Sequence, residues 1–160
     1  MFISLLVLAS CQPNPQALAA RQYLVDLDPL LLENGLVAER LLVQAGAVHD
    51  AKAQPKDTYQ AWSADIVPLA EHLRDEAAAL NAPPDWLEAH KDLAAIWSTR
   101  ADGYRDIAEA VDVGDPKLFK QGRDLADTAK LREESWFRDT NARLETYSLY
   151  VDQFPDPELR

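Results

Sequence analysis

The sequence predicts an all-α protein, an antiparallel up-down-up-down bundle of four long helices. Glycine is scarce, with 5 residues in a chain of 160. Apolar residues recur at alternating spacings of three and four, which is the period of an amphipathic helix. Breaks rich in proline and glycine, near residues 54–56, 81–85 and 114–116, divide the periodic stretches. Long helical segments joined by short turns are typical of such a bundle.

The first helical segment is predicted from about Gln16 to Ala53. Asp28 and Pro29 interrupt it, because aspartate is a good N-cap and proline suits the first turn of a helix. The segment is therefore either a short helix followed by a long one or a single helix kinked at Pro29. Its apolar positions recur at helical spacing: Leu24, Leu27, Leu31, Ala38, Leu41, Ala45 and Val48.

The second helix is predicted to start near Asp57, which resembles a capping box together with Gln60. Pro68 lies inside this helix, where it removes one backbone hydrogen bond and clashes with the carbonyl of Ala64, so we expect a kink. The predicted seam contains Tyr59, Trp62, Ile66, Leu69, Leu73, Glu76 and Leu80.

The third helix is predicted to follow the proline-rich turn at residues 81–85. Gly114 should end it, and Asp115 and Pro116 should begin the fourth helix as its N-cap and first residue. The stripe of the third helix contains Leu87, His90, Ala94, Trp97, Ala101, Tyr104, Ala108 and Val111.

The fourth helix is predicted from Pro116 to about Gln153. It has an early stripe of Leu118, Gly122, Leu125, Ala129 and Arg132, and a late stripe of Phe137, Thr140, Leu144, Tyr147, Val151 and Phe154. The two stripes do not share one phase, so we expect the helix to drift or stutter near Trp136. Its charged residues are interpreted as a solvated face: Arg123, Asp124, Asp127, Lys130, Arg132, Glu133, Glu134 and Arg138.

The single cysteine, Cys11, follows an apolar run at the N-terminus. The residues Leu8-Ala9-Ser10-Cys11 are an aliphatic residue, two small residues and a cysteine. This pattern resembles the lipobox of bacterial lipoproteins, and the resemblance covers residues 1–15. It implies that the signal peptide is cleaved before Cys11 and that the thiol of Cys11 is lipidated.

The resemblance also implies a location in the cell envelope, lipid-anchored and facing the periplasm. The residue after the cysteine is Gln12 rather than aspartate, which implies the outer rather than the inner membrane. Residues 1–10 contain no Lys or Arg, so either the α-amino group supplies the usual positive charge or the true start lies upstream. We divide the chain into a signal peptide (1–10), a lipidated N-terminus with a short linker (11–16), the bundle (17–154) and a tail (155–160).

The charge of the chain limits its partners. It carries 27 acidic and 16 basic residues, a net charge of −11. Such a surface repels phosphates, so we expect no nucleic-acid binding. It also repels anionic lipid, so attachment to a membrane would depend on the acyl chains at Cys11.

One constellation could hold a metal ion. His72 and Glu76 lie one turn apart on the second helix, and folding the hairpin about Pro83 brings Glu76 level with His90. Two histidines and a carboxylate would suit zinc or copper. We prefer the alternative, in which His90 is a buried structural residue hydrogen-bonded to Glu76 and His72 faces water.

The chain lacks common catalytic motifs. The chain has no nucleophile elbow, no phosphate-binding glycine-rich loop and no His-Glu-x-x-His motif. Tryptophans and tyrosines at helical spacing are expected in the core. The sequence therefore predicts a non-enzymatic lipoprotein without a cofactor, an interaction or structural module with an envelope protein as a partner. The alternative is a periplasmic binder of a metal or small ligand through His72, Glu76 and His90.

Overall fold

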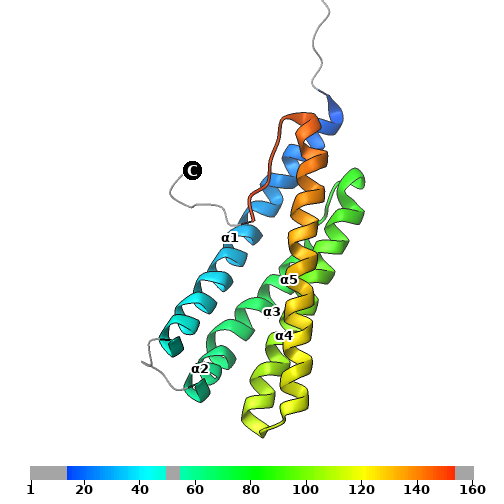
Figure 1. The fold of residues 1–160 in the computed structure, drawn as a ribbon. Helices are drawn as coiled ribbons and strands as arrows, with labels where there is room; N and C mark the ends of the chain where they lie inside the picture. The colour runs from blue at the N-terminus through cyan, green and yellow to red at the C-terminus, as the bar shows by residue number, and fades with distance from the viewer. Residues whose placement is uncertain (1–13, 50–54, 154–160) are drawn as a thin grey trace, which may run out of the picture.

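The computed structural model describes residues 14–49 and 55–153. Within these residues the chain forms an all-α four-helix bundle without strands, and the helices alternate in direction (Figure 1). The predicted fold class is confirmed. The elements are α1 (Pro15–His49), α2 (Pro55–Ala61), the π-helical turn η1 (Trp62–Ile66), α3 (Val67–Ala79), the 3-10 turn η2 (Pro84–Trp86), α4 (Leu87–Val113), α5 (Pro116–Leu144) and the 3-10 turn η3 (Glu145–Tyr147).

Helix α1 continues through Pro29 as a single helix, which excludes the alternative of a short helix followed by a long one. Pro29 and Val25, whose carbonyl loses its donor, both belong to the exposed side of the helix, so water can replace the missing hydrogen bond. At the start of α1, the Asn14 side chain accepts a hydrogen bond of 3.0 Å from the backbone N–H of Gln16. The helix therefore begins at Pro15, inside the segment that we expected to be a linker.

The second helical segment accommodates Pro68 by a widened turn. The π-helical turn η1 directly precedes α3, and Pro68 is the second residue of α3. A proline cannot donate to the carbonyl four residues earlier and clashes with it in a regular α-helix. The π turn changes the spacing of the carbonyls at that point, so the kink expected at Pro68 takes this form.

The residues that end α4 and begin α5 are those that the sequence predicts. Gly114 adopts a left-handed conformation with φ of 72° and ends α4. The Asp115 side chain accepts hydrogen bonds from the backbone N–H groups of Lys117 and Leu118, at 2.8 and 3.2 Å, and so caps α5. The prediction of Asp115 as the N-cap is confirmed.

The prediction that the fourth helix reaches Gln153 is wrong. Helix α5 ends at Leu144, and Ser148 adopts a left-handed conformation with φ of 56°. The N–H of Leu149 donates to the carbonyl of Leu144, and that of Ser148 to the carbonyl of Glu145. This is a Schellman ending, formed here without the glycine that would have marked it in the sequence.

Helix α5 is a single α-helix from Pro116 to Leu144, so the change of phase expected near Trp136 involves no break in the helix. Glu133 is buried and not part of a solvated face. With Glu133 included, one continuous stripe joins the early and late positions: Gly122, Ala129, Glu133, Trp136, Phe137, Thr140 and Leu144.

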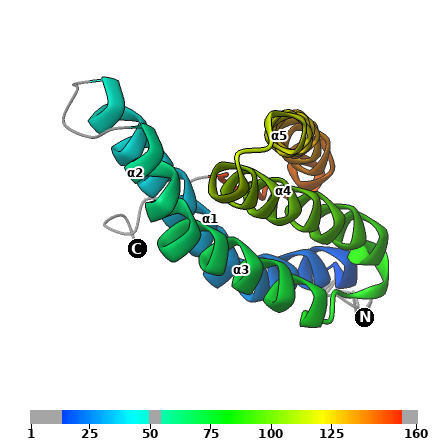
Figure 2. The same cartoon turned by 90° about the horizontal axis from the view of Figure 1, so that it is seen from below.

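Helices α4 and α5 approach each other most closely, and a pair of glycines permits this. A Cβ on Gly103 would lie 2.7 Å from the carbonyl oxygen of Gly122, and a Cβ on Gly122 would lie 2.6 Å from that of Gly103. In the end-on view α1 and α3 lie side by side, α4 packs across them, and α5 packs on α4 (Figure 2). Helices α1 and α5 therefore do not close against each other as the other neighbouring helices do.

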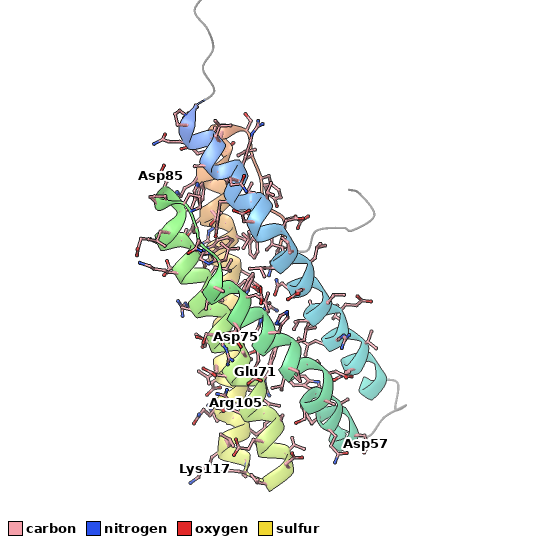
Figure 3. All side chains as sticks on the ribbon, turned by 180° about the vertical axis from the view of Figure 1, so that it is seen from behind. Asp57, Glu71, Asp75, Asp85, Arg105 and Lys117 are labelled. Atoms are coloured by element: carbon pink, nitrogen blue, oxygen red, sulfur yellow. The ribbon has the colours of Figure 1, made fainter. Side chains whose placement is uncertain are left out.

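The outer face of α3 and α4 carries charged side chains (Figure 3). Glu71 on α3 and Arg105 on α4 form an ion pair there, with Arg105 Nη1 3.4 Å from Glu71 Oε1. Exposed pairs of this kind contribute little to stability. The stability of the bundle therefore depends mainly on its buried apolar core, which includes Tyr23, Leu27, Leu73, Trp86, Leu93, Trp97 and Leu144.

Candidate functional site

The residues predicted to bind a metal do not come together. His90 is buried with 4% of its surface exposed, whereas His72 and Glu76 are exposed. His72 Nε2 lies 3.6 Å from Glu33 Oε1 on α1. Among the described residues no three His, Cys, Asp or Glu side chains are grouped to hold a metal ion.

The burial of His90 is confirmed, but the prediction that Glu76 is its partner is wrong. His90 Nε2 lies 2.8 Å from the carbonyl oxygen of Ala77, and Nδ1 lies 3.2 Å from the Tyr23 hydroxyl. A carbonyl only accepts, so Nε2 donates to it, and in the neutral ring Nδ1 accepts from the Tyr23 hydroxyl. Both nitrogens of His90 are engaged within the protein, which makes this a structural contact between α1, α3 and α4.

The lipobox residues, including Cys11, lie outside the described residues. Lipidation at Cys11 therefore stays a prediction. No helix in the described part of the chain is long and apolar enough to cross a membrane.

The open side between α1 and α5 contains a cavity of about 510 Å³. This volume is within the range of sites that take small molecules. Four aromatic residues from α2, η1, α4 and α5 form part of its wall: Tyr59, Trp62, Tyr104 and Phe119. Aliphatic residues form another part of the wall: Val37, Ala38, Leu41, Leu42, Ile107 and Ala126. The remaining lining residues are charged or polar: Arg100, Arg123, Asp127, Lys130, Glu133, Glu134 and Gln153.

The aromatic rings contact one another edge to face. The ring centroids of Tyr59 and Trp62 are 5.3 Å apart, and those of Tyr59 and Phe119 and of Trp62 and Tyr104 are each 5.5 Å apart. Such contacts hold the rings in fixed orientations. The expectation that Trp62 and Tyr104 serve only as core is therefore incomplete, because both also line the cavity.

A layer of buried polar residues borders the cavity. Arg100 on α4 donates through Nη1 to both carboxylate oxygens of Glu133 on α5, at 3.2 and 3.4 Å, and through Nη2 to Asn34 Oδ1 on α1, at 2.5 Å. Arg100, Glu133 and Asn34 are 8%, 4% and 1% exposed. A buried charge is tolerated only when it is paired and hydrogen-bonded, and this layer meets that condition.

Two further donors complete the environment of Glu133. Trp97 Nε1 donates to Oε1 at 2.6 Å, and Gln153 Nε2 donates to Oε2 at 3.0 Å. Gln153 belongs to the extended segment after η3, where the backbone N–H and carbonyl of Val151 bond to the side chain of Asn141 at 2.8 and 3.0 Å. The segment after η3 therefore lies at the same polar layer as α1, α4 and α5.

Tyr104 adds a neutral hydroxyl to the wall of the cavity. Burial raises the pKa of the Tyr104 hydroxyl above its ordinary value, and the nearby Glu133 carboxylate raises it further, while Arg100 acts in the opposite direction. The hydroxyl therefore stays protonated at neutral pH. The cavity thus presents hydrogen-bonding groups without an additional unpaired charge at this position.

Sequence reasoning missed Arg100, Glu133 and Asn34. A signal existed for Glu133, since its position continues the helical stripe from Ala129 to Trp136. Arg100 stands between Trp97 and Tyr104 of the predicted stripe. A charged residue in phase with apolar residues on each of two helices is a reason to expect a buried ion pair.

Comparisons with known proteins add no relatives. No protein-family model, no curated protein and no solved structure matches the chain.

Proposed function

We propose that this chain is a non-enzymatic binding protein of the bacterial cell envelope, held on a membrane through a lipidated Cys11. The helical body faces the periplasm and binds a small, mainly apolar molecule in the cavity between α1 and α5. The observation that supports this most strongly is the cavity itself, about 510 Å³ with aromatic and aliphatic walls beside a buried polar layer. Pockets of this composition commonly bind small ligands.

The proposed site differs from the metal or ligand site that the sequence suggested. The His72, Glu76 and His90 side chains do not group, so the ligand-binding role moves to the cavity. The lipobox pattern supports the membrane tether, and Gln12 supports the outer membrane. An acidic body with a net charge of −11 depends on the acyl chains for this attachment, because anionic lipid repels it.

Binding can be tested with N-phenyl-1-naphthylamine, an uncharged apolar fluorophore that brightens in apolar sites. The wild-type chain should enhance its emission, and Ala38→Trp should abolish most of the enhancement, because the new indole occupies the cavity that Ala38 lines. Ala78→Trp, at an exposed position of α3, is the matched control and should bind as the wild type does. Equal binding by all three proteins would contradict the site.

The tether can be tested by intact mass and fractionation in a host that processes lipoproteins. The native protein should begin at Cys11 and carry diacylglycerol and an acyl chain, and Cys11→Ala should leave the membrane fraction or remain unprocessed. An unmodified Cys11 still joined to Ser10 would exclude the lipoprotein assignment. Enrichment of a specific envelope protein with the tethered wild type, unchanged in Ala38→Trp, would favour a protein partner over a small ligand.

A further inference from the structure

The buried polar atoms near the cavity that lack a partner among the described residues are donors. The two buried acceptors without a partner, Glu33 Oε2 and Gln44 Oε1, belong to residues that do not line the cavity. The Glu133 carboxylate accepts from Trp97 and Arg100 at Oε1 and from Arg100 and Gln153 at Oε2. Three donor atoms make these four contacts, with Arg100 Nη1 shared between the two oxygens, and they occupy the roughly four lone-pair positions that a carboxylate offers. Glu133 therefore has no accepting capacity to spare for a bound molecule.

Three buried donors in the same region have no acceptor among the described residues. They are Trp62 Nε1, Arg100 Nε and Asn34 Nδ2. Trp62 and Arg100 line the cavity, and Asn34 is bonded to Arg100. Buried N–H groups in native proteins are almost always paired, so an acceptor brought to these three donors would add hydrogen bonds.

The formal charges around the cavity balance. The lining contains Arg100, Arg123 and Lys130 on one side and Asp127, Glu133 and Glu134 on the other. Net charge therefore does not select an anion or a cation in this cavity, and the hydrogen-bonding groups of a ligand decide its orientation instead. At the buried end, beside Arg100 and Trp62, a ligand whose polar end carries only acceptor oxygens fits the unpaired donors, whereas an ammonium group would bring donors to donors. The Asp127 and Glu134 carboxylates, which could accept from an ammonium group, are exposed.

We propose that the cavity binds a long-chain acyl compound, with its carbonyl or carboxylate oxygens toward Arg100 and Trp62 and its hydrocarbon chain against the aromatic and aliphatic walls. This assignment rests on the proposed function, because a tether at Cys11 would keep the cavity beside a bilayer, where acyl compounds are concentrated. The acyl oxygens receive hydrogen bonds from Arg100 Nε and Trp62 Nε1, which are covered in the structure and turn toward the ligand when it binds. The chain covers apolar surface that the gap between α1 and α5 leaves open.

Three probes of equal chain length test whether binding requires hydrogen-bond acceptors at the polar end or only apolar contact. Hexadecanoic acid, methyl hexadecanoate and hexadecylamine are each titrated against N-phenyl-1-naphthylamine bound to the full chain carrying Cys11→Ala, which lacks its own acyl groups. We expect the acid and the ester to displace the fluorophore at concentrations at least about tenfold lower than the amine, because only they supply acceptors to the buried donors.

Substitution of Trp62 tests the donors directly. Trp62→Phe keeps an aromatic ring but removes one unpaired N–H, so the preference for acid and ester over amine should shrink severalfold. Trp136→Phe is the matched control, because the Trp136 indole donates to the Ala89 carbonyl at 2.6 Å and does not line this cavity. It should leave the preference unchanged.

The outcomes distinguish this inference from the proposed function. Equal displacement by all three probes, or a preference that survives Trp62→Phe in full, would overturn the acyl assignment and leave an apolar binding site standing. Failure of the wild type to bind the fluorophore at all would instead contradict the proposed function.

Discussion

The two halves of this bundle differ in how completely their buried polar groups are hydrogen-bonded. In the closed half, which contains Tyr23, Trp86 and His90, the hydroxyl of Tyr23 and the carbonyl of Ala77 engage both nitrogens of His90. In the open half, around Trp62, Arg100 and Tyr104, a cavity remains and N–H groups of Trp62 and Arg100 have no acceptor.

This difference separates the buried polar residues that stabilise the fold from those that are available for binding. A fully paired buried group fixes the register of its helices and has nothing left to offer a ligand. An unpaired buried donor destabilises the empty protein, since it loses its hydrogen bonds to water without replacement. The closed half is therefore structural, and the open half is where a ligand could add hydrogen bonds.

The boundary between the halves is the Arg100–Glu133 pair, and Glu133→Ala should have the largest effect of the variants considered. It leaves the buried Arg100 charge without its partner, which typically costs about 3–5 kcal/mol. Urea unfolding followed by far-ultraviolet circular dichroism measures the loss. Glu133→Gln, which keeps acceptor and volume, should lose less, and a loss below about 1 kcal/mol for Glu133→Ala would mean that the pair does not stabilise this boundary.

Gly103 and Gly122 permit the close approach of α4 and α5. Gly122→Ala places a methyl group 2.6 Å from the Gly103 carbonyl oxygen, so the helices must separate, at a cost of about 1–3 kcal/mol. Gly35→Ala is the control, because its Cβ would meet nothing within 4 Å, and it should be neutral or stabilising by up to about 1 kcal/mol. Thermal unfolding of both variants checks the contrast, and equal stability would refute it.

Trp97 and Trp62 allow a comparison between a hydrogen-bonded indole and one without an acceptor among the described residues. Trp97 Nε1 donates to Glu133, whereas Trp62 Nε1 has no acceptor in the described chain. Both replacements by phenylalanine remove the same ring volume, so the hydrogen bond should make Trp97→Phe about 1–3 kcal/mol more destabilising than Trp62→Phe. Denaturant titrations of the two variants measure this difference, and similar losses would show that the indole of Trp62 is as well bonded as that of Trp97.

The smallest of these effects is the loss of stability at alkaline pH, which should be absent near neutrality and should grow above pH 10. Burial raises the pKa of Tyr23 and of Tyr104 above the ordinary value of 10.0, although Arg143 and Arg100 respectively oppose the shift. The folded state then holds these protons more tightly than the unfolded state, so the stabilisation is complete below pH 10 and is lost as pH rises through the folded pKa values.

Melting temperatures between pH 8 and pH 11 test this pH dependence. The wild type should lose stability above pH 10, and Tyr104→Phe should reduce the loss by removing one of the two groups. Tyr150→Phe, at a residue that is 71% exposed, should follow the wild type. A flat profile up to pH 11 would indicate that neither hydroxyl is desolvated.

The sequence by itself determined the helical segments and the turn between α4 and α5, but not the end of α5 at Leu144. Gly114 and Asp115 act through their own backbone and side chain, so the end of α4 and the cap of α5 could be predicted locally. Helical spacing also placed Trp97 and His90 on the buried side of α4. Periodicity reports which face of its own helix a residue occupies, and for these positions that was sufficient.

Only the tertiary structure decided what lies opposite each buried residue. The pairing of Arg100 with Glu133, and of His90 with Tyr23 rather than Glu76, depends on the relative positions of three helices, which the spacing along one helix does not specify. The cavity likewise depends on packing, because residues of α1, α4 and α5 that are far apart in the sequence line it together. The binding site is therefore a property of helix packing, because it forms where two helices that the sequence makes individually amphipathic do not meet.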